Sequence, residues 1–89
     1  MLIEVTQEDI DEGMPADGQR CPVALAIKRT LKIDNVLVGP WHIWIGDSDC
    51  YITDPKVNAF IDLFDRCADG TSPITFKLKL RKRIRRTDD

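Results

Sequence analysis

The chain has 89 residues, of which 43% are hydrophobic and 31% are charged, enough for one compact domain but not for two. Thirteen basic and fifteen acidic residues nearly balance, and with this hydrophobic content they exclude the composition of a disordered chain. The longest apolar run covers only residues 22–27, and no charged-then-apolar segment opens the chain, so we expect neither a membrane-spanning helix nor a secretion signal.

The first twenty residues predict a strand, a short helix and a loop. Residues 2–5 form a β-branched and aliphatic run that is typical of a strand. This run stops at Thr6, which with Asp9 resembles a capping box, so a helix of one or two turns should begin there. Gly13 is placed to end that helix, and the composition of residues 14–20 favours a loop.

A longer helix and a strand follow the loop. Cys21 and Pro22 mark the helix start, because proline at the first helical position loses no needed amide hydrogen bond. An apolar stripe then extends over residues 23–31, with most of the charged side chains opposite or at its edges. Residues 36–38 predict a short strand, which the strong turn signal of residues 39–40 ends.

Two further short strands are predicted from the middle of the chain. Residues 41–45 alternate strictly, with the tryptophan at 41 and two isoleucines on one side and His42 and Trp44 on the other. A hairpin with the preceding strand is the expected product. Residues 46–49 then form a turn, and residues 50–53 form the next strand.

The last third of the chain predicts a helix and a long strand. Residues 54–55 supply an N-cap aspartate and a first-turn proline, and apolar residues recur at helical spacing over 57–68. Gly70 is suited to end this helix. Residues 74–80 alternate between apolar and mainly cationic side chains, which predicts a half-buried strand with one core face and one cationic face.

These elements predict an α+β fold with a small antiparallel or mixed sheet of four to five strands and two main amphipathic helices packed on one face. We expect the terminal strands, residues 2–5 and 74–80, to pair with each other. Residues 1–82 should form a single domain, and residues 83–89 a charged C-terminal tail.

Charge is distributed unevenly along the chain. Residues 1–20 contain six acidic residues and one basic residue, whereas residues 77–86 contain seven basic residues and no acidic one. This asymmetry can indicate attraction to nucleic acid, to a phosphate-bearing ligand or to an acidic partner. It can equally be satisfied within one molecule or between copies, or reflect a solvated strand face that leads into a frayed tail.

No catalytic or metal-binding signature stands out, and we expect no enzyme activity and no cofactor. Cys21 at a helix start could be acidified by the helix dipole, but nothing in the spacing joins it to His42, the single histidine. A buried cysteine is the simpler interpretation. Wide spacing also argues against zinc at Cys21, Cys50, Cys67 and His42, and three scattered cysteines fit a reducing cytoplasm.

The remaining candidate is a binding surface. Aromatic side chains of the hairpin could stack on a base or fill a partner's pocket, unless they pack in the core. If Trp44 is exposed, self-association as a dimer or larger homo-oligomer could cover it, and basic residues of the last strand could then bind phosphate in a groove between copies. The predicted ligand-binding residues are His42, Trp44, Tyr51, Lys79, Arg81 and Arg83.

Two segments carry a resemblance to a known group of proteins. Residues 3–11 and 21–29 resemble small uncharacterised proteins encoded by bacteriophages and prophages, with similarity mainly over residues 3–31 and a looser echo in 57–65 and 76–80. The resemblance assigns no functional residue. It implies a phage context, in which many short accessory proteins block or sequester components of host defence, and hence a place in the host cytoplasm.

The leading hypothesis is therefore a non-enzymatic, self-associating phage-type binding protein. As a counter-defence factor it would sequester a nucleotide signal or block a host defence protein. The alternative is a nucleic-acid-binding accessory protein that uses the basic residues 77–86. A third hypothesis is a thiol-dependent enzyme centred on Cys21.

Overall fold

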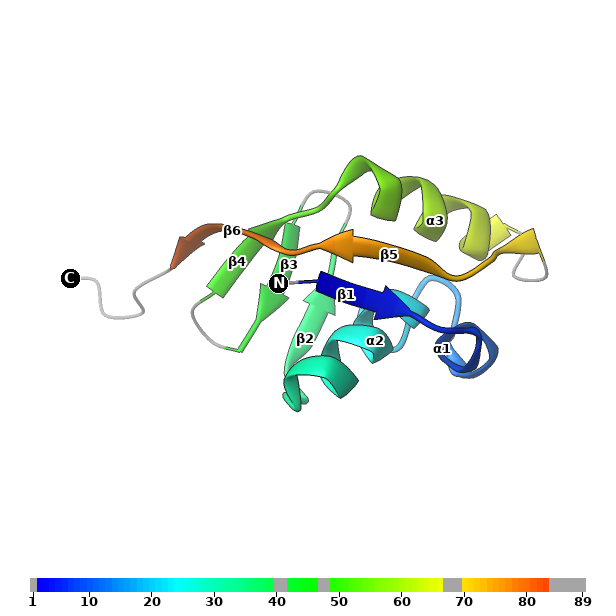
Figure 1. Cartoon of the computed structure of the whole chain (residues 1–89), viewed down its shortest axis with the longest axis horizontal. Coiled ribbons are helices and arrows are strands. Elements are labelled where there is room, and N and C mark those ends of the chain that lie inside the picture. The colour runs from blue at the N-terminus through cyan, green and yellow to red at the C-terminus, as the bar shows by residue number, and fades with distance from the viewer. Residues whose placement is uncertain (1, 40–41, 47–48, 67–69, 84–89) are drawn as a thin grey trace.

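The computed structural model describes residues 2–39, 42–46, 49–66 and 70–83, and of these 79–83 are described by their backbone alone. The α+β class is confirmed (Figure 1). No helix within the described part of the chain is both long and apolar enough to cross a membrane. In chain order the elements are β1 (Leu2–Val5), α1 (Gln7–Glu12), α2 (Pro22–Leu31), β2 (Val36–Val38), β3 (His42–Ile45), β4 (Asp49–Ile52), α3 (Pro55–Arg66), β5 (Ile74–Lys77) and β6 (Lys79–Arg83).

Local sequence signals fix the helix starts as expected. The Thr6 hydroxyl accepts the Asp9 N–H at 3.2 Å, and the Asp9 carboxylate accepts the Thr6 N–H at 2.9 Å, so the predicted capping box of α1 is confirmed. Cys21 caps α2, where its sulfur accepts the Ala24 N–H at 3.4 Å. Asp54 precedes α3 and accepts the backbone N–H of Lys56 at 2.8 Å.

The strands form two antiparallel sheets where a single sheet with both helices on one face was expected. β1 pairs with β5 in one sheet, and the other has the order β2-β3-β4-β6. The predicted strand over residues 74–80 is interrupted at Leu78, which separates β5 from β6 and so joins the two sheets (Figure 1). Each half of that segment finds a different partner, and this is why one long strand became two.

The predicted pairing of the terminal strands is confirmed for β1 and β5. Ile3 lies opposite Phe76, and both are buried, while Glu4 lies opposite Thr75. Directly opposite residues share a face of an antiparallel pair, so one face of this ribbon is apolar and the other faces solvent. The β1–β5 pair therefore packs against the core with one face only.

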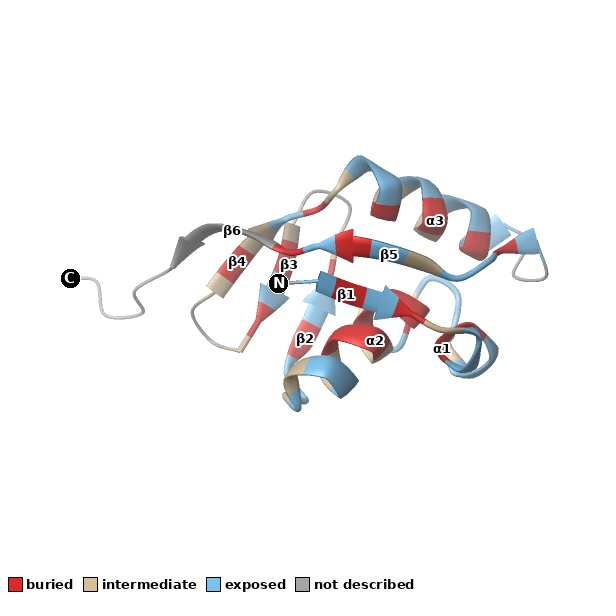
Figure 2. Cartoon of the chain, in the orientation of Figure 1, coloured by how far each residue is buried: buried red, intermediate tan, exposed pale blue. Residues whose placement is uncertain are grey.

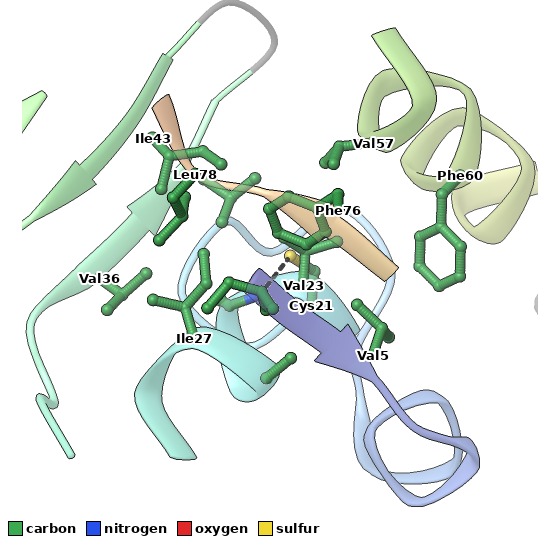
Figure 3. Packing of buried hydrophobic residues seen from close by; sticks show 14 of the residues in the cluster. Val5, Cys21, Val23, Ile27, Val36, Ile43, Val57, Phe60, Phe76 and Leu78 are labelled. Atoms are coloured by element: carbon green, nitrogen blue, oxygen red, sulfur yellow. Dashed lines mark hydrogen bonds between the residues drawn. The ribbon is translucent and has the colours of Figure 1, made fainter. Parts of the chain in front are cut away.

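One core joins both sheets and both main helices. Figure 2 shows that buried residues line the inner sides of α2, α3, β1 and β5. In Figure 3, Val57 and Phe60 of α3 lie on one side of Phe76, and Ile27 of α2 lies toward Val36 and Ile43 of the larger sheet. Leu78 is buried at the junction of the two sheets. Apolar packing at this junction stabilises the domain.

Candidate binding surface

The predicted alternation in β3 decides which side chains reach solvent. Ile43 and Ile45 are buried, whereas Trp44 between them is 40% exposed. Successive side chains of a strand point to opposite faces, so β3 presents its isoleucines to the core and Trp44 outward. His42 shares the Trp44 side of the strand and is half-buried. Trp41 lies outside the described residues, so its predicted place on the isoleucine side stays a prediction.

Strand register brings two further apolar residues to the same surface. Leu37 of β2 lies opposite Trp44 and is 45% exposed, and Ile52 of β4 lies opposite His42 and is 42% exposed. The rings of His42 and Trp44 are 6.2 Å apart and tilted by 50°. We call the surface formed by Leu37, His42, Trp44 and Ile52 the outer face. Three sizeable apolar side chains on it are accessible to a partner.

Tyr51 lies on the other side of the sheet. It pairs with Ile43, is half-buried and packs against the core. Residues directly opposite each other share a face, so register separates Tyr51 from Trp44 and His42. Of the three aromatic residues predicted for the site, the structure therefore brings His42 and Trp44 together and leaves Tyr51 apart.

The three predicted basic residues belong to β6, at one edge of the larger sheet. In the backbone register, Lys79 lies opposite Ile52 and Arg83 opposite Asp49, while Arg81 falls at a register shift and has no direct partner in β4. The side chains of residues 79–83 and the tail over 84–89 lie outside the described part of the chain. The structure therefore gives a position along the sheet for these residues and nothing further.

The predicted site residues did not include Leu37 or Ile52, and Lys82 was predicted only as part of the basic run over residues 77–86. Leu37 stands between two valines, so residues 36–38 show no alternation of apolar and polar side chains. Only the structure, in which both valines are buried, shows that Leu37 points outward. Lys82 lies opposite Cys50 in the backbone register, and Cys50 lies opposite Trp44. These relationships depend on pairing between strands, which is set by contacts distant in sequence.

Cys21 does not show the properties of an activated nucleophile. Its side chain is buried, and burial raises the pKa of the thiol, an effect that the carboxylates of Asp65 and Asp17 increase. Hydrogen bonds to the sulfur from the backbone at Ala24 and Val23 act in the opposite direction but are outweighed. A nucleophilic cysteine needs a lowered pKa and access to solvent. Cys21 is instead an interior cap of α2 (Figure 3).

Among the residues with described positions, no three histidine, cysteine or acidic side chains come together in a way that could hold a metal ion. Cys67, one of the four ligands considered for zinc, is outside that set.

Comparisons of the chain with protein-family models, with curated proteins and with solved structures found no match.

Proposed function

We propose that the protein is a non-enzymatic binding protein whose outer face binds the surface of another protein. The observation that carries this proposal is the direct cross-strand pair of Leu37 and Trp44, both of which are exposed to solvent over about two fifths of their surface. Tryptophan is enriched among residues that dominate binding energy at protein interfaces. Contiguous exposed apolar side chains on a small domain are typical of an interaction site.

The charge of the adjacent strand restricts the kind of partner. Residues 77–86 contain seven basic residues and no acidic one, and β6 within this segment lies beside β4. A partner with an apolar centre and acidic residues around it would complement such a surface, because opposite potentials favour encounter and specificity. The resemblance to phage-encoded proteins makes a host defence protein in the cytoplasm the class of partner that we propose.

A phosphate-containing ligand is the second candidate, and it is favoured by a separate observation. The rings of His42 and Trp44 lie 6.2 Å apart on the outer face and offer a stacking surface for a nucleobase. In the backbone register, Lys79 lies opposite Ile52, next to this surface. A nucleotide signal or a single-stranded nucleic acid would use the rings for its bases and the basic strand for its phosphates.

Site-specific photocrosslinking in bacterial cells tests the proposal. A benzophenone amino acid replaces Leu37 in one protein and Leu63 of α3 in a control protein, because Leu63 is equally exposed at 44% but lies away from the outer face. The proposal predicts a discrete protein adduct from position 37 that is lost when Trp44→Ser is added. The control position should give no such adduct.

The other outcomes assign the surface differently or reject it. An adduct that nuclease removes, or one whose formation falls steeply as salt is raised during crosslinking in lysate, would favour the phosphate-containing ligand. An adduct that contains only two copies of this chain would assign the outer face to a homo-oligomer. Equal crosslinking from positions 37 and 63, or no adduct from position 37, would contradict a binding role for the outer face.

A further inference from the structure

A second surface feature lies between α3, the loop over residues 14–20 and the end of β2. It is a cavity of about 510 Å³, and none of the four outer-face residues lines it. Cys21, Val38 and Ile61 supply apolar wall. Asn58 contributes an amide, and three carboxylates, those of Asp17, Asp62 and Asp65, complete the polar part of the lining.

Hydrogen bonds hold the loop that forms one wall in place. The Ala16 N–H donates to the Asp65 carboxylate at 2.9 Å, which ties the loop to α3. The Val38 N–H donates to the Gly18 carbonyl at 2.8 Å, which ties it to β2. A side chain at position 18 would meet the Val38 carbonyl oxygen at 2.7 Å, so glycine permits this close approach. The cavity is therefore bounded on two sides by fixed backbone.

The charge of the lining is negative. Three carboxylates face no lysine or arginine within the described lining. Arg66 lies next to the cavity and pairs with Asp62 at 3.3 Å along α3. The Asp17 carboxylate accepts the backbone N–H groups of Gln19 and Arg20 at 2.9 and 3.1 Å, and the Asp65 carboxylate accepts that of Ala16, so these two carboxylates are bonded to neutral donors. Burial raises the pKa of Cys21, and Asp65 and Asp17 raise it further, so the field of these carboxylates reaches the cavity wall. Negative potential beside apolar wall is suited to a cation with an apolar stem.

We propose that this cavity binds an amine or guanidinium group that is carried on an apolar stem. Its volume is within the range of small-molecule sites, which are mostly apolar with a few placed polar groups. The carboxylates of Asp65 and Asp17 would hold the cation, and the wall formed by Cys21, Val38 and Ile61 would contact the stem. Two sources share this chemistry: a free small amine, and a lysine or arginine side chain of a bound protein.

Nuclear magnetic resonance titration with matched probes tests this assignment. Tryptamine carries an amine on an indole, indole-3-ethanol is its neutral counterpart, and N-acetylarginine amide represents a protein side chain. Saturable shifts are expected for the backbone amides of Gly18 and Gly39 and the side-chain amide of Asn58. At least one cationic probe should bind about fivefold or more tightly than indole-3-ethanol. Tighter binding of tryptamine would indicate a free amine, and tighter binding of the arginine probe a partner's side chain.

Charge variants separate binding from folding. Asp65→Asn keeps an oxygen that can accept the Ala16 N–H but removes the negative charge. It should weaken the binding of the cationic probe several-fold without changing the affinity for the neutral probe. Arg66→Gln removes the positive charge that pairs with Asp62, so the cationic probe should bind more tightly. Asp34→Asn, an exposed carboxylate outside the lining, is the matched control and should change nothing.

Three results would overturn the proposal. The first is an absence of saturable shifts with both cationic probes up to about 10 mM. The second is binding of both cationic probes that is no tighter than that of indole-3-ethanol, which would leave the carboxylates without a role. The third is a cationic affinity that Asp65→Asn and Arg66→Gln leave unchanged. None of the substituted residues and none of the observed amides belongs to the four outer-face residues, so a failure of this proposal can be told apart from a failure of the proposed binding function.

Discussion

Arg29 donates from one guanidinium nitrogen to the Asp9 carboxylate at 2.8 Å and to the Glu4 carbonyl at 2.9 Å. Asp9 is only 6% exposed, and the same carboxylate oxygen accepts the Thr6 N–H in the capping box. Through these contacts one side chain of α2 is joined to the end of β1 and to the first turn of α1. The short helix is thereby fixed to the core.

We predict that Arg29→Ala lowers the free energy of unfolding by about 1–2 kcal/mol, because it leaves the buried Asp9 carboxylate without its cationic partner. The value is moderate since half of the Arg29 side chain is exposed. Urea unfolding followed by circular dichroism measures it. Arg66→Ala is the control, because its pair with Asp62 joins two exposed side chains and should change stability by about 0.5 kcal/mol or less. Equal effects of the two variants would contradict the prediction.

Gly18 is predicted to tolerate no side chain. In Gly18→Ala the added carbon would lie 2.7 Å from the Val38 carbonyl oxygen and 2.9 Å from the Leu37 side chain, so the loop must move. We expect a loss of about 1–3 kcal/mol in the free energy of unfolding, as in overpacked sites. Gln19→Ala at the exposed neighbouring position should cost about 0.5 kcal/mol or less. A Gly18→Ala protein as stable as the Gln19→Ala protein would show that the loop is not held against β2.

The Cys21 thiol should make stability depend on alkaline pH. Burial raises its pKa in the folded chain, so the folded chain retains the proton to a higher pH than the unfolded chain does. The contribution of the protonated thiol to the free energy of unfolding is therefore complete below about pH 8.5, the ordinary pKa of a thiol, and declines as the pH rises toward the raised pKa of the folded chain.

Comparison with Cys21→Ser isolates this effect, because the serine hydroxyl can replace the sulfur as the cap acceptor and the other titrating groups are the same in both proteins. The difference in unfolding free energy between the original protein and the variant should become smaller between about pH 8 and pH 10. Alkylation of Cys21 at pH 8, located by peptide mass spectrometry, should also be slower than that of a model thiol. A constant difference together with fast alkylation would contradict a raised pKa.

Signals within a few residues of each other were enough to predict the helices. Thr6 and Asp9 are three positions apart, Cys21 and Pro22 are adjacent, and each signal produced the expected helix start. Alternation likewise predicted the buried and exposed sides of β3. In each case the controlling interactions are local, so the chain order itself contains the information.

Pairing between distant strands could not be predicted in the same way. The alternation over 74–80 continues through Leu78, but β5 pairs with residues 2–5 and β6 with residues 49–52. Nothing local signals that change of partner. Tyr51 shows the same limit, because its face depends on the register of β4 against β3, and a shift of one residue would reverse it.

The cavity beside α3 was also beyond the reach of the sequence. Asp17, Val38 and Asp65 come from three elements, and only tertiary packing brings them to one lining. By contrast, His42 and Trp44 were found because they are two residues apart in one strand. The part of the outer face on β3 could therefore be predicted from the sequence pattern, whereas the parts on β2 and β4 could not.

Native mass spectrometry of the protein recovered from cells tests the binding role of the outer face most directly. The account predicts that the original protein retains a bound protein, that Trp44→Ser is a bare monomer, and that Leu63→Ser, altered at a similarly exposed position, retains the partner. A bare monomer for the original protein, or an equally retained partner in Trp44→Ser, would contradict it.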